Sequence, residues 1–301
     1  MYHLATAFPI ARRVRLPLSR DQLMLLMAAI NEIFLGIDIY LAHSISGTIV
    51  PNEWIPILFG PAAGVLLLLA GLIAFRQRPL ATVIATLVFV TSIGVGLLGA
   101  YFHLVRAILP NALPGQQVSI DLLVWAPPIL GPLMFALVGV FGLSAAWVED
   151  PPDSGELVLL GGRRLRLPYS KTRAYFFIVG MAALATVISS VLDHARANFA
   201  NPWLWAPTIA GIFGAVIAVV VGALDHPRRP DLILYTLAML ALIAVGVIGA
   251  LLHVNSNLIA QGTIVGERFV RGAPFLAPLL FANVGTLGLI ALLPPSEEKK
   301  S

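Results

Sequence analysis

The feature that most limits how this chain can fold is the length of its apolar runs. A helix needs about 20 mainly apolar residues to cross the hydrocarbon core of a bilayer. Eight runs reach that length, at residues 23–47, 53–75, 80–105, 122–147, 174–197, 203–224, 231–254 and 274–293. Only 11% of the residues are charged, against about 25% in a soluble domain. The sequence therefore predicts an all-α integral membrane protein with eight transmembrane helices.

The positions of lysine and arginine predict which side of the membrane each loop occupies. Of the 19 basic residues, all but four fall in the terminal segments and in alternate loops, and such an excess marks the cytoplasmic side. The four exceptions are Arg106, Arg196, Arg268 and Arg271. Both termini are therefore expected to be cytoplasmic, in a bacterial inner membrane. The basic pI of 9.7 follows from this topology, so we expect the lipid bilayer as partner and no nucleic acid.

The second half of the sequence matches the first. The segment "IGVGLLGAYFH" (93–103) aligns with "IAVGVIGALLH" (243–253), and "PILGPLMFALVGVFG" (128–142) aligns with "PFLAPLLFANVGTLG" (274–288). Because each unit has an even number of helices, the two repeats run parallel. We therefore predict two four-helix bundles side by side. Their boundaries are a cytoplasmic segment 1–22, repeat 23–147, cytoplasmic linker 148–173, repeat 174–293 and cytoplasmic tail 294–301.

The linker is polar and rich in proline and glycine. It is expected to form a small hairpin that turns at Gly161 and Gly162. Docking of a cytoplasmic partner is the alternative role for this segment.

Four histidines lie at the outer ends of the odd-numbered helices: His43, His103, His194 and His253. Alternate helices of an up-and-down bundle are diagonal neighbours, so these residues are expected to form two facing pairs. Imidazole is a common metal ligand, and two opposed imidazoles can hold a haem iron. The chain has no cysteine, which excludes thiolate ligands and disulfides. Another metal site, and interfacial or packing histidines, remain as alternatives.

A repeated pattern, Gly-Ala-x-x-His, ends the third and seventh runs. Gly99 and Gly249 each precede a histidine by one helical turn, where a small residue would leave room for a flat macrocycle. Arg106 and Arg196 follow histidines closely and are expected to pair with the propionates of a haem. Glycine at this spacing is also common where transmembrane helices pack closely, which is the competing interpretation.

Two carboxylates interrupt the first apolar run, Glu32 and Asp38. Acidic side chains inside a membrane are costly, so they usually face the bundle interior and have a function. We predict that they carry protons or lie beside a quinone, or else contact a neighbouring subunit. Glu32 lies 11 residues before His43, which places both on nearly the same face of the helix.

Three functions are compatible with these patterns. The first is a membrane subunit of an electron-transfer or photosynthetic complex that binds tetrapyrrole, of the haem b type or a (bacterio)chlorophyll, and exchanges electrons with quinol. The second is an accessory subunit without cofactor that packs against other membrane subunits. The third is a proton-coupled transporter, with a transition metal as one candidate substrate. Catalytic residues are not identified, and any enzymatic role would be that of a membrane oxidoreductase subunit.

Overall fold

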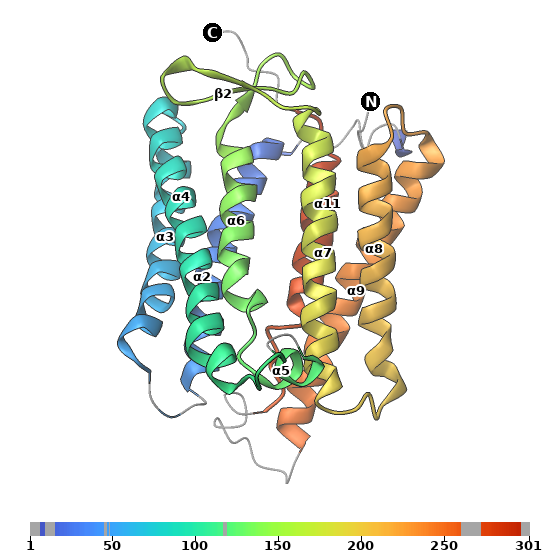
Figure 1. Cartoon of the computed structure of the whole chain (residues 1–301). Coiled ribbons are helices and arrows are strands. Elements are labelled where there is room, and N and C mark those ends of the chain that lie inside the picture. The colour runs from blue at the N-terminus through green and yellow to red at the C-terminus, as the bar shows by residue number, and fades with distance from the viewer. Residues whose placement is uncertain are drawn as a thin grey trace.

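The computed structural model describes residues 7–9, 16–44, 47, 49–116, 119–259 and 272–295. Some of the basic residues from which the topology was predicted lie outside these ranges: Arg12, Arg13, Arg15, Arg268, Arg271, Lys299 and Lys300. The described chain is a long bundle of helices with a small three-stranded sheet at one end (Figure 1). We call this end the sheet end and the opposite end the histidine end.

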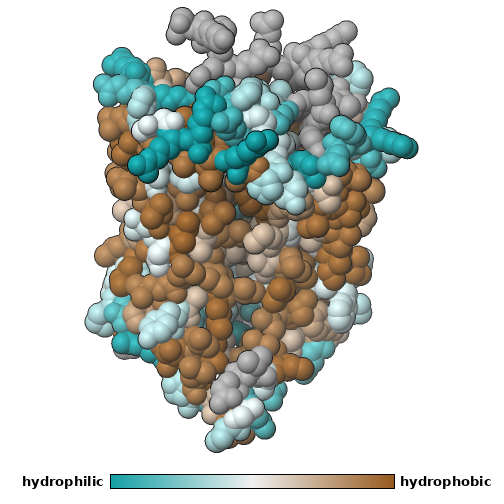
Figure 2. All heavy atoms as spheres, turned by 45° about the horizontal axis from the view of Figure 1, so that its top comes forward, coloured by the Kyte–Doolittle hydropathy of each residue, from teal (hydrophilic) through white to brown (hydrophobic). Residues whose placement is uncertain are grey.

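Six helices of the described residues are long and apolar enough to cross a membrane. They belong to α2 (Arg20–Ser44), α3 (Trp54–Ile73), α4 (Arg78–Phe102), α7 (Lys171–Ala195), α8 (Trp205–Ala223) and α9 (Arg229–Ile259). On the face shown in Figure 2, hydrophobic side chains form a wide band, and hydrophilic side chains gather beside it at the sheet end. The chain is thus an all-α, multi-pass membrane protein, as the apolar runs predict.

The fourth and eighth predicted runs form shorter helices than expected. Here α6 (Leu130–Ala146) has 17 residues and α11 (Leu279–Ala291) has 13. The runs were predicted to begin at residues 122 and 274, but Pro127, Pro128 and Pro274 precede the helical parts. Proline has no N–H to donate and restricts the residue before it, so the helices begin later. A separate short helix, α5 (Ile120–Trp125), lies at the histidine end.

The helices pack in the same order in the two parts of the chain, which we call the first half (20–146) and the second half (171–291). In the first half α2 packs on α3 and α4 packs on α6, while in the second half α7 packs on α8 and α9 packs on α11. Within each half these helices contact one another, and the halves meet where α6 and α5 contact α7 and where α2 contacts α11.

The segment between the halves forms the sheet. Strand β1 (Val148–Glu149) pairs with β2 (Glu156–Val158), and β2 pairs with β3 (Arg164–Arg166), both antiparallel. The hairpin predicted at Gly161 and Gly162 connects β2 and β3, and both glycines have positive φ angles, of 69° and 74°. Glycine adopts this backbone conformation without steric cost, which explains why the turn forms there.

Buried charged side chains form hydrogen bonds between the two halves at the sheet end. Arg20 begins α2 and donates to Thr172 Oγ1 across 2.6 Å, while Lys171 begins α7 and donates to Asp21 Oδ2 across 2.7 Å. Arg20 is 2% exposed and Lys171 is 0% exposed. Lys171 Nζ also donates to the Trp147 carbonyl at 2.8 Å. A cation of the first half is thus bound by the second half, and a cation of the second half is bound by the first.

Candidate functional site

The structure brings the first predicted histidine pair together. His43, near the end of α2, and His103, which follows α4, have ring centroids 6.1 Å apart and planes inclined by 65°. A carboxylate that was not predicted joins them, because Glu53 Oε1 lies 3.8 Å from His43 Nε2. The side chains of His43 and Glu53 are 21% and 26% exposed. Two imidazoles and one carboxylate therefore form a half-buried polar group at the histidine end.

Hydrogen bonds to backbone carbonyls define which nitrogen of each ring carries hydrogen. His43 Nδ1 is 2.8 Å from the Ile39 carbonyl, and His103 Nδ1 is 2.9 Å from the Pro128 carbonyl. A carbonyl oxygen only accepts, so each Nδ1 is assigned as the N–H donor, and in the neutral ring Nε2 carries the lone pair. This is the arrangement in which protein histidines present Nε2 to a metal.

The contact between His103 and Pro128 has a local cause in α6. Pro132 has no N–H, so the carbonyl four residues earlier, that of Pro128, lacks its helical donor. The imidazole of His103 supplies that missing donor from the neighbouring helix. A buried or partly buried carbonyl without a partner is costly, so this bond stabilises the broken start of α6.

The glycine of the repeated pattern makes a close helix contact in this structure. A Cβ placed on Gly99 would lie 2.7 Å from Pro132 Cβ, closer than side-chain carbons approach. The space that the sequence interpretation reserved for a macrocycle is therefore filled by proline from α6. Gly99 allows α4 and α6 to approach each other, and the same approach brings His103 to Pro128.

The second half repeats this contact. His253 Nδ1 is 2.9 Å from the Pro274 carbonyl, which also accepts a longer bond from the Ala277 N–H at 3.3 Å. A Cβ on Gly249 would lie 2.9 Å from Pro278 Cβ. The Gly-Ala-x-x-His pattern thus joins two helices in each half through one proline contact and one histidine bond.

The second histidine pair is arranged differently from the first. His194 packs edge-on against Phe199 with ring centroids 6.1 Å apart, and its Nδ1 lies 3.4 Å from Ser190 Oγ. His253 is near enough to influence His194 electrostatically, as is the adjacent Asp193. The structure therefore places these residues in one region but gives His194 an aromatic neighbour where His43 has His103.

The two arginines predicted to hold propionates have protein partners here. The guanidinium of Arg106 lies over the Phe102 ring, 4.9 Å from its centroid. Arg196 Nε donates to the Val124 carbonyl at 2.8 Å, and its Nη1 lies 4.0 Å from Asp193 Oδ1. Arg196 thereby ties α7 to the short helix α5.

The two membrane carboxylates of α2 are in different surroundings. Glu32 is completely buried, and its Oε1 lies 2.6 Å from Ser92 Oγ of α4. Asp38 is exposed on the isolated chain, and Asp193 of α7 is close enough to interact with it electrostatically. Because Glu32 is buried against α4 and Asp38 is exposed, the two side chains leave α2 on different faces. Their predicted role in carrying protons stays a prediction.

Several residues of these sites were missed in the sequence. Glu53 comes just before the second apolar run, and Ser92 is one of few polar residues inside the third run. Both are ordinary residues at their positions, and only the packing of helices distant in sequence gives them partners. Among the described residues, no group of three or more His, Cys, Asp or Glu side chains is placed to hold a metal ion.

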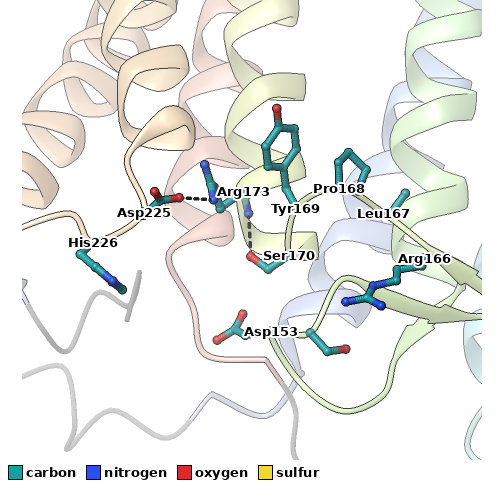
Figure 3. A pocket seen from close by; sticks show the side chains of 10 residues that line it. Asp153, Arg166, Leu167, Pro168, Tyr169, Ser170, Arg173, Asp225 and His226 are labelled. Atoms are coloured by element: carbon teal, nitrogen blue, oxygen red, sulfur yellow. Dashed lines mark hydrogen bonds and ion pairs between the residues drawn. The ribbon is translucent and has the colours of Figure 1, made fainter.

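A polar pocket of about 760 Å³ lies at the sheet end, at the opposite end of the molecule from His43 and His103 (Figure 3). Arg173 crosses it to Asp225, with Nη1 and Oδ1 2.8 Å apart, and Ser170 caps α7 by accepting from the Arg173 N–H. His226 and Arg166 lie at its margins (Figure 3). Because its lining mixes both charges and is largely exposed, this pocket does not define a ligand class.

Comparisons with known proteins give no assignment for this chain. A scan against family models, a search of curated proteins and a search of solved structures each found no match.

Proposed function

We propose that the chain is a subunit of an electron-transfer or photosynthetic complex in the bacterial inner membrane, and that it binds a tetrapyrrole of the haem b type through His43 and His103. One observation carries this proposal. The two rings lie 6.1 Å apart, and each is oriented by an Nδ1 bond to a backbone carbonyl. Such bonds fix the tautomer in which Nε2 is the ligand atom.

The residues fit this group in part. A haem iron needs only two protein ligands, and His43 and His103 supply two imidazoles at one place. The space next to Gly99 is taken by Pro132, so that glycine is not part of the binding surface. When bound, such a group would carry single electrons, and its place at the outer end would suit exchange between membrane quinol and an outer partner. The protein would orient both rings and, through Glu53, hold negative charge beside His43.

We also propose the finer architecture of eight spans in two parallel repeats with both termini cytoplasmic. In support, the order of helix packing is the same in the two halves, and each half has the same bond from histidine to a proline carbonyl. The 17 residues of α6 and the 13 of α11 extend about 25 and 20 Å at 1.5 Å per residue. The proline segments before them would complete each crossing, since irregular backbone is tolerated where protein covers it.

An accessory subunit without cofactor is the second candidate. It is supported by the contacts of Gly99, Gly249, His103 and His253, all of which join helices. The exposed Asp38 on a membrane helix also suits contact with a neighbouring subunit, because lipid does not solvate a carboxylate.

The absorption spectrum of the protein purified in mild detergent, before and after dithionite reduction, distinguishes these candidates. The proposal expects a reduced haem band with about one iron per chain. His103→Ala should abolish the band, whereas His253→Ala should keep it. These variants are matched, because each removes one bond to a proline carbonyl. A far-red band with magnesium would indicate a chlorophyll instead, and a colourless protein free of iron would overturn the proposal in favour of the accessory subunit.

A further inference from the structure

Glu32 occupies the middle of the membrane-spanning part of the first half. It is the thirteenth of the 25 residues of α2, which places it about 18 Å from either end of the helix. Its side chain is 0% exposed. The carboxyl points to α4, where its Oε1 lies 2.6 Å from Ser92 Oγ, while its Oε2 is buried without a hydrogen-bond partner.

The hydrogen bonds around Ser92 require a hydrogen that serine alone does not provide. Ser92 Oγ lies 2.6 Å from Glu32 Oε1 and 2.8 Å from the Phe135 carbonyl of α6. A hydroxyl has one hydrogen, and a carbonyl and an ionised carboxylate only accept. With an ionised Glu32, one of these two short contacts would therefore lack a hydrogen. With a protonated Glu32, the carboxyl donates to Ser92 and Ser92 donates to Phe135, so both contacts are satisfied.

The helices around Glu32 offer no positive charge at its depth. Among the described helices, α3, α6 and α11 pack against α2. None of these three contains a titratable side chain. The titratable residues of α2 and α4 lie away from the centre: Arg20, Asp21, Asp38, Tyr40, His43, Arg78 and Tyr101. Burying an ionised carboxylate without a cation nearby costs much free energy. This favours a protonated Glu32, as do the hydrogen bonds around Ser92.

Apolar side chains separate this group from the histidines. Ile39, Ile57, Val95 and Phe135 form a small buried cluster of their own, distinct from the larger core cluster that contains Phe89. Phe135 belongs to this cluster and also provides the carbonyl that Ser92 binds. The polar group is thus enclosed by apolar packing, with one carboxyl oxygen still able to accept a hydrogen bond.

We infer that Glu32 and Ser92 form a proton-binding site in the centre of the first half, with the proton resident on Glu32 and exchangeable with the solvent. This inference goes beyond the proposed cofactor and does not depend on it. The ligand is a proton, held by a carboxyl that is hydrogen-bonded through Ser92 to the backbone of α6. A small monovalent cation between the three oxygens is the competing ligand.

Infrared spectroscopy of the whole protein in lipid at neutral pH tests the inference, because a protonated carboxyl has a C=O band separate from that of a carboxylate. We expect the band of one protonated carboxyl, which shifts in D₂O and is lost in Glu32→Gln. Glu53→Gln is the control and should leave the band unchanged. If Glu32→Gln does not fold, Ser92→Ala serves instead, and it should move the band because the hydroxyl acceptor is gone, while Ser92→Thr should keep it in place.

Three results would overturn the inference. A wild-type protein without the band would mean that Glu32 is ionised. A band that does not shift after prolonged incubation in D₂O would mean that the proton is locked in and not exchangeable. A band that is present in choline buffer and disappears as Na⁺ is added would assign the site to the cation.

Discussion

The two halves of the molecule share their helix contacts and differ in their interiors. Both halves join two helices through a glycine–proline contact and a histidine bond to a proline carbonyl. The first half encloses Glu32 and Ser92. Glu32 and Ser92 each lie 11 residues before a histidine, His43 and His103. In the second half the positions 11 residues before His194 and His253 are Ala183 and Leu242, which are apolar and completely buried.

Comparing the halves separates features of the scaffold from features of a functional site. A feature present in both halves, such as the bond from histidine to a proline carbonyl, is explained by the packing that each half requires. A buried carboxyl present in one half only is not needed for that packing, because the second half fills the same space with apolar side chains. Among the described residues, the buried carboxyl of Glu32 and the His43, His103 and Glu53 group occur in the first half only, and they are therefore the better candidates for function.

The largest effect is expected where the halves join. Lys171→Ala should lower the free energy of unfolding by about 3–5 kcal/mol, because it breaks a buried ion pair. The cation then left near Asp21 is the more distant Arg20, whose Nε lies 3.7 Å from Asp21 Oδ1. Arg164→Ala is the matched control, since Arg164 pairs with Asp150 and Glu156 on an exposed surface, where such a pair contributes about 0–1 kcal/mol. Unfolding in mixed detergent and SDS micelles measures both. Equal effects would mean that the buried junction does not hold the halves together.

Two variants test whether the apolar residues of the second half can replace Glu32 and Ser92 in the first half. Ser92→Leu alone should cost about 2–4 kcal/mol, because it adds volume and removes the partner of a buried carboxyl. The double variant Glu32→Ala with Ser92→Leu places the residue types of Ala183 and Leu242 in the first half. Its free energy of unfolding should be within about 1 kcal/mol of the wild-type value, because apolar replacement of a buried polar pair is often nearly neutral. A double variant as unstable as Ser92→Leu would show that the halves are packed differently.

The smallest effect is expected at the glycine–proline contacts, which the two halves share. Gly99→Ala and Gly249→Ala should each cost about 1–3 kcal/mol, since the added carbon meets a proline in both halves. Gly94→Ala on the same helix α4 meets nothing within 4 Å and should be neutral or stabilising by about 0.5–1 kcal/mol. The thermal midpoint in detergent, followed by tryptophan fluorescence, provides the measurement. Different costs at Gly99 and Gly249 would mean that the two contacts are not equivalent.

Much of the helical layout could be predicted, and most of the site could not. The long apolar runs of α2, α3, α4, α7, α8 and α9 became membrane-length helices, because such runs must satisfy their own backbone in lipid. The runs before α6 and α11 were extended too far, since hydropathy does not register the missing N–H of proline. The contact of His43 with His103 followed from bundle geometry, whereas that of Glu53 with His43 depends on how the chain enters α3.

That this chain is helical and apolar enough to cross a membrane several times follows from its amino-acid sequence, because the length and composition of each run suffice for that. The sequence also indicated that glycine and histidine act together at two places. What they act on depends on the tertiary fold. The proline carbonyls lie 25 and 21 residues after the histidines, and the proline rings lie 33 and 29 residues after the glycines. The same holds for Glu32, whose hydrogen bond joins residues 60 positions apart, because hydrogen bonds of buried groups are set by which helices touch.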